Sequence, residues 1–394
     1  MQQRRFLFLE SFAGGSHLAF AEGLRRHSAH EIELLTLPAS NWRWRRRGAA
    51  LRFADRLAEA AGAPRPSANP AARPLTLEGY DGLIVSDLLD LADLRALVST
   101  PPVLLYMHES QMTYPLPKGR SVDTDTAFTD IRNATLADRI LFNSEFHRAR
   151  FFEVAGEVLS AAPAGEVPEL LPSVRDRAGV LYPGCELADL APNPAPADPV
   201  PADATPADPA PARESGPLIV WNHRWEYDKN PRPFFRSLET LSSEGRAFRL
   251  VLLGENPQYH PKEFEAARES LRPHIVHYGY ASDRETYART LRAADIVVST
   301  SLQENFGIAT VEAVAAGCVP LLPRRLSYPE IIPSAYHDAC LYGSNRELLE
   351  KLRRFVVEGP PAVPGLSAAM RRRYDWRVLA PRYDRELLRL AAAG

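Results

Sequence analysis

Two glutamates and a glycine stand close together in the stretch "TSLQENFGIATVEAVAAGCVPLLP", residues 300–323. Glu304 comes just before the turn expected at Gly307, and Glu312 follows eight residues after Glu304 in an alanine-rich helical pattern. A helix that begins after this turn presents unpaired backbone N–H groups, which suit a phosphate. Glu312 would then accept hydrogen bonds from a ribose hydroxyl pair, and Glu304 would reach a sugar beyond the phosphates. The simpler interpretation is an ordinary helix with a charged N-terminus.

Arg224 and Lys229 supply the positive charge that such a ligand needs. They lie five residues apart in "NHRWEYDKNP", directly after an apolar run that predicts a strand. The planar fork of arginine and the point charge of lysine can together neutralise a diphosphate. Each residue alone is an ordinary surface charge, but with the glutamate loop they predict a nucleotide-diphosphate sugar as ligand.

Length and composition limit the possible classes of protein. The chain has 394 residues, which suits two domains, and a formal net charge of −2, which excludes a bulk polycation. An RNA partner would therefore need a local basic patch. Cys185, Cys318 and Cys340 are widely spaced and form no zinc-binding pattern, as is typical of a reducing compartment. No apolar run approaches the roughly 20 residues of a membrane span, so we expect a soluble, cytoplasmic protein.

Short apolar runs alternate with helix-length segments along the whole chain. Continuous runs rich in leucine and β-branched residues are typical of parallel strands that are covered on both faces. We therefore predict an α/β protein with two Rossmann-like halves. The predicted strands are residues 5–10, 81–87, 102–108, 138–144 and 178–184 in the first half, and 217–223, 248–254, 274–280, 295–301 and 318–324 in the second.

One composition break divides the chain. Residues 191–215 are mostly alanine and proline, which cannot supply a core and favour an extended linker or insertion. We predict an N-terminal domain at 1–190, a C-terminal domain at 216–373, and a final helix at 374–394 that packs back on the N-terminal domain. A second proline-bearing stretch, near 156–176, is predicted to be a loop.

Polar residues gather where the predicted strands end, which is where ligands bind in parallel sheets. "GGSH", residues Gly14, Gly15, Ser16 and His17, follows the first strand, and His108 follows the third. The glycines let the backbone approach a phosphate or the acceptor, or they merely permit the turn. Each histidine could hydrogen-bond a sugar or the acceptor, although a satisfied histidine in a packed loop is the commoner outcome. We expect the active site in a cleft between the two halves.

The segment "NWRWRRRG", residues 41–48, has a composition suited to RNA. Arginines that alternate with tryptophans combine phosphate neutralisation with flat surfaces on which an unstacked base can lie. The alternative is the start of an amphipathic helix whose tryptophans pack inward and whose arginines are solvated. On the RNA interpretation, the acceptor is contacted by Trp42, Arg43, Trp44, Arg45, Arg46 and Arg47.

Arg224, Lys229, Glu304 and Glu312 together resemble the signature of the retaining GT-B glycosyltransferases, and the resemblance covers nearly the whole second half. It implies two Rossmann-like domains facing across a cleft, with the arginine and lysine on the diphosphate, the first glutamate on the donor sugar and the second on the ribose. Asn305 stands where the wider family usually has glycine. Further donor contacts are implied at Gly14, Gly15, Tyr280, Asn305, Phe306, Gly307 and Ile308.

The first half is similar to the tRNA-queuosine mannosyltransferases. "LESFAGGSH", "TLPASNWRWRRRGAALRFA", "LYMHESQMTYPL" and "ADRILFNSEFHRARF" match that family in order and wording. The resemblance implies GDP-mannose as donor and the cyclopentene diol of queuosine in the anticodon of tRNA-Asp as acceptor. It places His108 beside the donor sugar, and Ser16, His17, Glu109 and Gln111 toward the acceptor. Ala13 departs from the family, where an aromatic residue is common, and the alanine–proline segment is unusual.

The implied reaction is transfer of mannose with retention of configuration. In a front-face substitution the departing diphosphate itself helps to take the acceptor's proton, and the catalytic candidates are His108, Arg224, Lys229 and Glu304. No metal and no other cofactor is expected. Two rival hypotheses remain: a GT-B mannosyl- or glucosyltransferase that acts on a carbohydrate or small molecule, and a catalytically silent module that binds a nucleotide sugar or RNA.

Overall fold

Two compact units make up the chain in the computed structural model. Unit 1 contains Met1–Gly184 together with Trp376–Gly394, and unit 2 contains Cys185–Asp375. The chain therefore passes from one unit to the other twice. The structure describes residues 3–65, 74–115, 123–191, 216–254 and 261–393.

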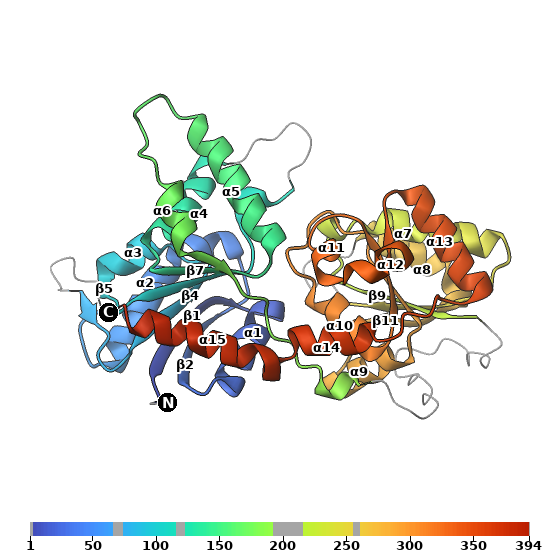
Figure 1. The fold of residues 1–394 in the computed structure, drawn as a ribbon, viewed down its shortest axis with the longest axis horizontal. Helices are drawn as coiled ribbons and strands as arrows, with labels where there is room; N and C mark the ends of the chain where they lie inside the picture. The colour runs from blue at the N-terminus through green and yellow to red at the C-terminus, as the bar shows by residue number, and fades with distance from the viewer. Residues whose placement is uncertain (1–2, 66–73, 116–122, 192–215, 255–260, 394) are drawn as a thin grey trace. The chain divides into compact units, whose positions relative to one another are not determined.

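Unit 1 is built on a six-stranded sheet in which every strand is parallel to its neighbours, in the order β2-β1-β4-β6-β7-β8 (Figure 1). Most of these strands are apolar runs buried on both faces, as a covered parallel sheet requires. The strands are β1 (Arg5–Ala13), β2 (Glu31–Pro38), β4 (Gly82–Ser86), β6 (Val103–Met107), β7 (Arg139–Phe142) and β8 (Ala178–Val180). A separate two-stranded sheet pairs β3 (Leu75–Thr76) with β5 (Val98–Ser99).

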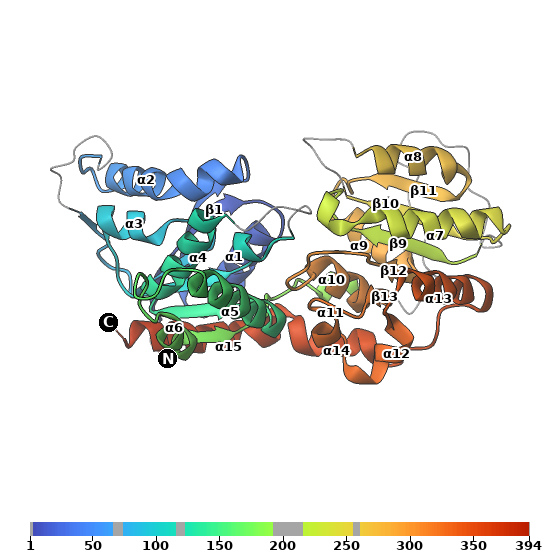
Figure 2. The same ribbon diagram turned by 90° about the horizontal axis from the view of Figure 1, so that it is seen from above.

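Helices cover both faces of the unit 1 sheet (Figure 2). They are α1 (Gly15–His27), α2 (Trp42–Ala60), α3 (Leu91–Leu97), α4 (Thr124–Leu136), α5 (Glu145–Ser160), α6 (Leu171–Arg177) and α15 (Trp376–Ala391). Successive residues of a strand point to opposite faces. Leu7 and Leu9 of β1 accordingly join the core under α2 to α5, while Phe6 and Phe8 join the core under α1 and α15.

The last helix, α15, completes the core of unit 1 although it comes from the far end of the sequence. Trp376 packs against Phe20 of α1, and a Cβ added at Gly23 would lie only 2.2 Å from the Trp376 side chain. Near the other end of the helix, Asp384 accepts a hydrogen bond from Ser28 Oγ at 2.6 Å. Unit 1 is therefore complete only when the chain has returned from unit 2.

Unit 2 repeats this architecture with the strand order β11-β10-β9-β12-β13-β14, again with parallel pairs. The strands are β9 (Leu218–Asn222), β10 (Arg249–Leu253), β11 (Ile275–Gly279), β12 (Ile296–Val298), β13 (Val319–Pro323) and β14 (Leu341–Tyr342). One face packs on α7 (Pro231–Ser243), α8 (Lys262–Ser270) and α13 (Asn345–Glu358). Of three further helices, α10 (Ile308–Ala316) packs against both α9 (Arg284–Ala293) and α14 (Leu366–Tyr374). Short helices α11 (Tyr328–Ile331) and α12 (His337–Cys340) lie between β13 and β14.

The predicted α/β fold with two Rossmann-like parallel sheets is confirmed, and each of the ten predicted strands forms. The sequence does not predict β2, in which exposed glutamates interrupt the apolar pattern at the sheet edge. The loop predicted near 156–176 is wrong in part, because α5 continues to Ser160 and α6 begins at Leu171. The predicted linker at 191–215 lies outside the described residues except for Ala191.

Candidate active site

The donor candidates of unit 2 gather at one edge of its sheet. In a doubly wound sheet the ligand binds at the carboxyl ends of the two strands between which the strand order reverses. In unit 2 these strands are β9 and β12, which pair directly. The segment after β9 carries Arg224 and Lys229, and the loop after β12 carries Glu304.

Lys229 is the best-defined cation of this site. Its Nζ donates to the Gln303 carbonyl at 2.9 Å and lies 3.0 Å from Asp228 Oδ2 and 3.4 Å from Glu304 Oε2. Lys229 is only 8% exposed. Burial alone lowers the pKa of Lys229, but the carboxylates of Glu304 and Asp228 raise it above that of an isolated lysine. Lys229 therefore carries a permanent charge in a site of low dielectric constant, where that charge acts strongly.

Arg224 differs from Lys229 in its exposure. Its side chain is 62% exposed and pairs with Glu226 at 3.2 Å. An arginine at such a surface can turn toward an arriving diphosphate at little cost, since exposed ion pairs contribute little to stability. The structure thus brings Lys229 and Glu304 into contact and leaves Arg224 at the rim.

The loop from Gln303 to Gly307, which leads into α10, is fixed by a glycine turn and by hydrogen bonds from Ser327. Gly307 is the N-cap of α10 with a φ of 94°, a conformation that favours glycine, and a Cβ there would lie 3.3 Å from Glu304 Cγ. Ser327 Oγ donates to the carbonyls of Glu304 and Phe306, both at 3.1 Å. The loop therefore keeps one conformation at the N-terminus of α10.

Asn305 and Phe306 turn their side chains into the protein. Asn305 is 8% exposed and accepts a hydrogen bond from Gln303 Nε2 at 3.1 Å. Phe306 is 3% exposed, and its ring packs edge-on against Tyr374. Donor contacts predicted for Asn305, Phe306 and Ile308 would thus come chiefly from the backbone of the loop and the first residue of α10.

Glu312 lies in α10, with both carboxylate oxygens already bonded. Arg284 Nη1 donates to Oε1 at 2.6 Å, and the Tyr287 hydroxyl donates to Oε2 at 2.7 Å. The sequence does not single out Arg284 or Tyr287, because they lie on α9 and their partner Glu312 lies on another helix, α10. Tyr280, predicted to border the base, directly follows β11 and is 71% exposed.

In unit 1 the strand order reverses between β1 and β4, and Glu10 lies at that point. Its carboxylate is fully buried and accepts from Ser86 Oγ at 3.0 Å and from the Phe12 backbone N–H at 2.8 Å. His17 Nδ1 lies 3.3 Å from both oxygens. Glu10 was not predicted as a site residue; the available signal is a charged residue that interrupts an apolar strand.

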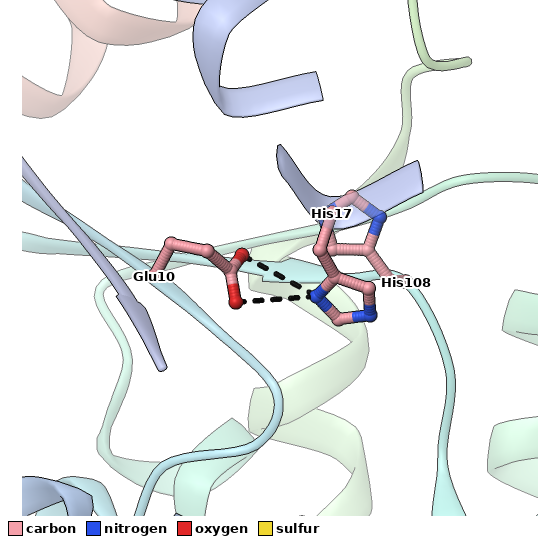
Figure 3. A group of neighbouring side chains, drawn as sticks. All are labelled: Glu10, His17 and His108. Atoms are coloured by element: carbon pink, nitrogen blue, oxygen red, sulfur yellow. Dashed lines mark hydrogen bonds and ion pairs between the residues drawn. The ribbon is translucent and has the colours of Figure 1, made fainter. Parts of the chain in front are cut away.

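His17 and His108 lie against each other beside Glu10, with their ring planes tilted by 32° (Figure 3). Their ring centroids lie 4.1 Å apart, and both residues are buried. Burial lowers the pKa of His108 well below its usual value, and the charge of His17 lowers it further. His108 is therefore neutral at neutral pH, and a neutral imidazole offers both a donor and an acceptor nitrogen, as sugar hydroxyls require.

Asp87 also belongs to this cluster, although the sequence does not predict it. It follows β4, and its Oδ1 accepts a hydrogen bond from the His108 backbone N–H at 2.9 Å. Burial raises the pKa of Asp87 to about 7, with His17 acting against the rise and Glu109 in favour of it. The carboxyl edge of unit 1 therefore combines two acids with two histidines, and the two histidines differ in protonation at neutral pH.

The donor atoms of Glu10, His17 and His108 lie within 4.8 Å of one another, which is close enough for a shared metal ion. Metal ligands must be deprotonated. Burial alone lowers the pKa of His17, but the charge and the hydrogen bond of Glu10 raise it to about 9. His17 is therefore an imidazolium that pairs with Glu10 at neutral pH, and this ion pair competes with a metal.

We expect this ion pair to make the stability of unit 1 depend on pH. The folded-state pKa of His17 is above the unfolded value, so its contribution is complete below about pH 6.5 and is lost as the pH rises through about 9. The loss amounts to about 3 kcal/mol. Urea unfolding at several pH values between these limits measures it. His17→Gln should remove most of this slope, and an identical slope in both proteins would show that the pair is not ionised.

The segment at 41–48 forms the start of α2, and its tryptophans are exposed. Trp44 is 79% exposed and Trp42 is 38% exposed, with the Arg43 guanidinium 5.3 Å from the Trp42 ring centroid. Arg47 is exposed and lies 3.8 Å from Asp125. The alternative in which the tryptophans pack inward is therefore wrong.

Arg46 corrects the prediction for this segment. It is 5% exposed, its Nη2 pairs with Asp130 Oδ1 at 2.7 Å, and it donates to the Thr126 carbonyl. Such a residue is unavailable to an RNA phosphate. The buried stripe of α2 runs through Arg46, Ala49, Ala50, Phe53 and Ala54, which is the helical period of an inward face.

The remaining predicted residues lie around the carboxyl edge of unit 1. A Cβ at Gly14 would lie 2.4 Å from Ala39 Cβ, so the glycine turn packs against the loop that leads into α2. Gly15 begins α1 with a φ of 51°, and Ser16 beside it is exposed. Gln111 Nε2 donates to Glu109 Oε1 at 2.6 Å. The glycine turn at Gly14 therefore lies beside the loop that leads into the segment at 41–48. The roles of both segments in binding stay predictions.

Solved structures share this fold over the whole chain. A sucrose-phosphate synthase from Thermosynechococcus elongatus aligns with a TM-score of 0.71 at 14% identity, covering 100% of both chains. HepE of Anabaena, in complex with UDP and glucose, aligns with a TM-score of 0.64 at 13% identity, covering 98% of this chain and 100% of that one. Two successive doubly wound sheets, with a cation–glutamate loop at the carboxyl edge of the second, place the chain in the GT-B fold class.

Sequence comparison narrows this class. The family model for the tRNA-queuosine alpha-mannosyltransferase N-terminal region matches residues 5–185, and the model for glycosyl transferases group 1 matches 207–372. The tRNA-queuosine alpha-mannosyltransferase of Drosophila melanogaster is 32% identical over 359 residues, covering 89% of this chain and 86% of that protein. The chain belongs to the tRNA-queuosine alpha-mannosyltransferase family.

A more distant relative matches only part of the chain. The GDP-mannose-dependent alpha-(1-6)-phosphatidylinositol dimannoside mannosyltransferase of Mycobacterium tuberculosis is 31% identical over 144 residues, covering 36% of each protein. Within the part of the chain that the structure describes, no helix has the length and apolar character needed to cross a membrane.

Proposed function

We propose that this protein transfers mannose from GDP-mannose to the cyclopentene diol of queuosine in the anticodon of tRNA-Asp, with retention of configuration. The observation that carries the proposal is the contact of the buried Lys229 with Glu304 where the strand order of unit 2 reverses, in a chain of this family. We also propose a cytoplasmic location for the reaction, since its acceptor would be a tRNA. The GDP-mannose dependence of the mycobacterial relative supports the choice of donor.

The donor would lie over the carboxyl edge of unit 2. Lys229, Arg224 and the N-terminus of α10 would stabilise the charge that develops on the diphosphate as it leaves, the kind of interaction that usually contributes most to catalysis. Glu304 would bind the mannose hydroxyls and Glu312 the ribose. No metal is required on this proposal, because the two cations and the helix N-terminus take its place.

The reaction breaks the bond between mannose C1 and the diphosphate oxygen and forms a bond from C1 to the acceptor oxygen on the same face. The acceptor's proton passes to the departing diphosphate. A double displacement would instead need a carboxylate nucleophile beside C1. Glu304 is engaged with Lys229, and Glu312 with Arg284, which supports the front-face path.

The exposed start of α2 is the surface we assign to tRNA. Replacing Arg43 and Arg47 with alanine should weaken tRNA binding and reduce the salt dependence by up to about one counterion per lost phosphate contact. Replacing Trp44 should lower affinity by about 1–3 kcal/mol if a base stacks on it, without unfolding the domain, because the ring is 79% exposed. Binding isotherms at several salt concentrations measure both effects.

GDP-mannose affinity is the control for these variants, and it should not change. Unchanged tRNA binding in the folded variants would move the acceptor to another surface. Arg46 is left out of the set because its loss would disturb folding.

The function itself is tested by incubating the protein with a panel of nucleotide sugars and with total tRNA from cells that contain or lack queuosine. Nucleoside mass analysis should show one added hexose on queuosine, with GDP-mannose as the preferred donor. Hexose transfer to small acceptors but not to tRNA would favour a small-molecule glycosyltransferase. Binding of the nucleotide sugar without any turnover would favour a silent module.

A further inference from the structure

Glu312 is held from two sides by residues of a neighbouring helix. Arg284, the first residue of α9, donates from Nη1 to Oε1 at 2.6 Å, and Tyr287 donates its hydroxyl to Oε2 at 2.7 Å. The two residues are three apart, so they lie on the same face of α9. We propose that Arg284 and Tyr287 are positioning residues that orient Glu312 for the ribose of the donor. This inference rests on the proposed role of Glu312.

Arg284 is itself fixed in place. Its guanidinium donates to both oxygens of Asp189, at 2.8 and 3.1 Å, and to the Glu186 carbonyl at 2.7 Å. A planar fork bound on several sides has little freedom to leave Glu312. The segment from Glu186 to Asp189 thus sets the position of the guanidinium, and the guanidinium sets the position of Glu312.

Tyr287 is fixed from the other side. Asn222, the last residue of β9, donates from Nδ2 to the Tyr287 hydroxyl at 2.8 Å and to the Ala309 carbonyl at 3.2 Å. Burial raises the pKa of Tyr287 well above its usual value, and Glu312 adds to the rise. Tyr287 therefore keeps its proton, and this proton bonds Glu312. The network joins Glu312 to the strand end where we place the diphosphate.

The acceptor positions that Arg284 and Tyr287 leave open on the Glu312 carboxylate suit the two hydroxyls of a vicinal diol. A carboxylate has about four acceptor positions, two on each oxygen. Arg284 occupies one position on Oε1 and Tyr287 occupies one on Oε2, so each oxygen keeps one position for a hydroxyl. The side chain of Glu312 is 12% exposed, which leaves it partly open to a ligand. One oxygen for each ribose hydroxyl is the arrangement that these bonds favour.

The test compares GDP with 2′,3′-dideoxy-GDP by calorimetry, in the parent protein and in Arg284→Ala, Arg284→Lys and Tyr287→Phe. The parent should bind GDP more tightly than the dideoxy compound by about tenfold or more. Arg284→Ala and Tyr287→Phe should reduce this ratio by severalfold and leave the affinity for dideoxy-GDP nearly unchanged. Arg284→Lys, which keeps the charge without the fork, should be intermediate.

Two further variants make the outcome decisive. Glu312→Gln should lose the discrimination directly, and Arg232→Ala, which breaks an arginine–glutamate pair with Glu263 elsewhere in unit 2, should keep the parent's ratio. An equal loss of affinity for both nucleotides in Arg284→Ala would show a merely structural role and overturn the inference. The inference would also be overturned if Arg284→Ala and Tyr287→Phe both kept the parent's ratio of GDP affinity to dideoxy-GDP affinity. Binding of GDP needs no acceptor. A negative result for the positioning of Glu312 is therefore distinct from a negative result for mannose transfer to tRNA.

Discussion

Replacing Lys229 with alanine is expected to lower kcat for mannosyl transfer by about 10²–10³-fold, the usual effect of removing a preorganised group that stabilises developing charge. The expectation rests on the position of Nζ, which is buried beside Glu304 and the loop that precedes α10. A fixed charge at this place acts mainly on the departing diphosphate. Initial rates at saturating GDP-mannose and tRNA measure the effect.

The matched control for this variant is Lys351→Ala. Lys351 is also partly buried in unit 2 and also holds backbone carbonyls and a carboxylate, at Asp338, Leu341 and Glu347, but it lies on α13. Its loss should affect stability and not kcat. Because Lys229→Ala leaves the buried Asp228 and the partly buried Glu304 without their cation, a melting curve must confirm that the variant folds. A folded variant whose kcat is within a few-fold of the parent would remove Lys229 from the catalytic set.

Replacing Arg46 with alanine is expected to lower the free energy of unfolding by about 3–5 kcal/mol, because removal of one partner leaves a buried charge uncompensated. That charge belongs to Asp130, which is 2% exposed and keeps a hydrogen bond only from Ser110 Oγ at 2.7 Å among its side-chain partners in the described residues. Burial already raises the pKa of Asp130. Urea unfolding of the variant and the parent measures the difference.

Arg43→Ala is the control for Arg46→Ala, since the two residues are one helical turn apart on the same helix. Arg43 is exposed, so its replacement should change the stability by no more than about 0.5 kcal/mol. Equal effects of the two substitutions would contradict the assignment of Arg46 to the core.

The strands could be predicted because their physical requirement is visible in the sequence. A parallel strand covered on both faces needs a continuous apolar run, and "LIVWN" and "VLLYM" are such runs of strand length. β2 could not be predicted in this way, because Glu31 and Glu33 stand on an edge strand and pair with Arg5 of β1. Edge strands tolerate charge, and the apolar run that identifies an inner strand is then missing.

The site was predictable only where its residues are close in sequence or resemble a known signature. Lys229 and Glu304 satisfy the second condition. Asp87 and Arg284 satisfy neither, because each acquires its role from a partner that the fold brings near. For Arg46 the helical period of α2 held the signal, yet its partner Asp130 lies 84 residues away. From composition alone an arginine is expected to be exposed to solvent. Arg46 is buried because Asp130 pairs with it.

We propose that a mannosyl group passes with retention from GDP-mannose to queuosine. The most direct measurement incubates the protein with GDP-mannose and two preparations of one tRNA, one with queuosine and one with guanosine at the same position. The queuosine nucleoside is then isolated and treated with an α-mannosidase. We predict one hexose on queuosine only, released by the α-specific enzyme, because an α-linked donor retains its configuration. A β-linked product, or equal transfer to the guanosine-containing tRNA, would contradict the account.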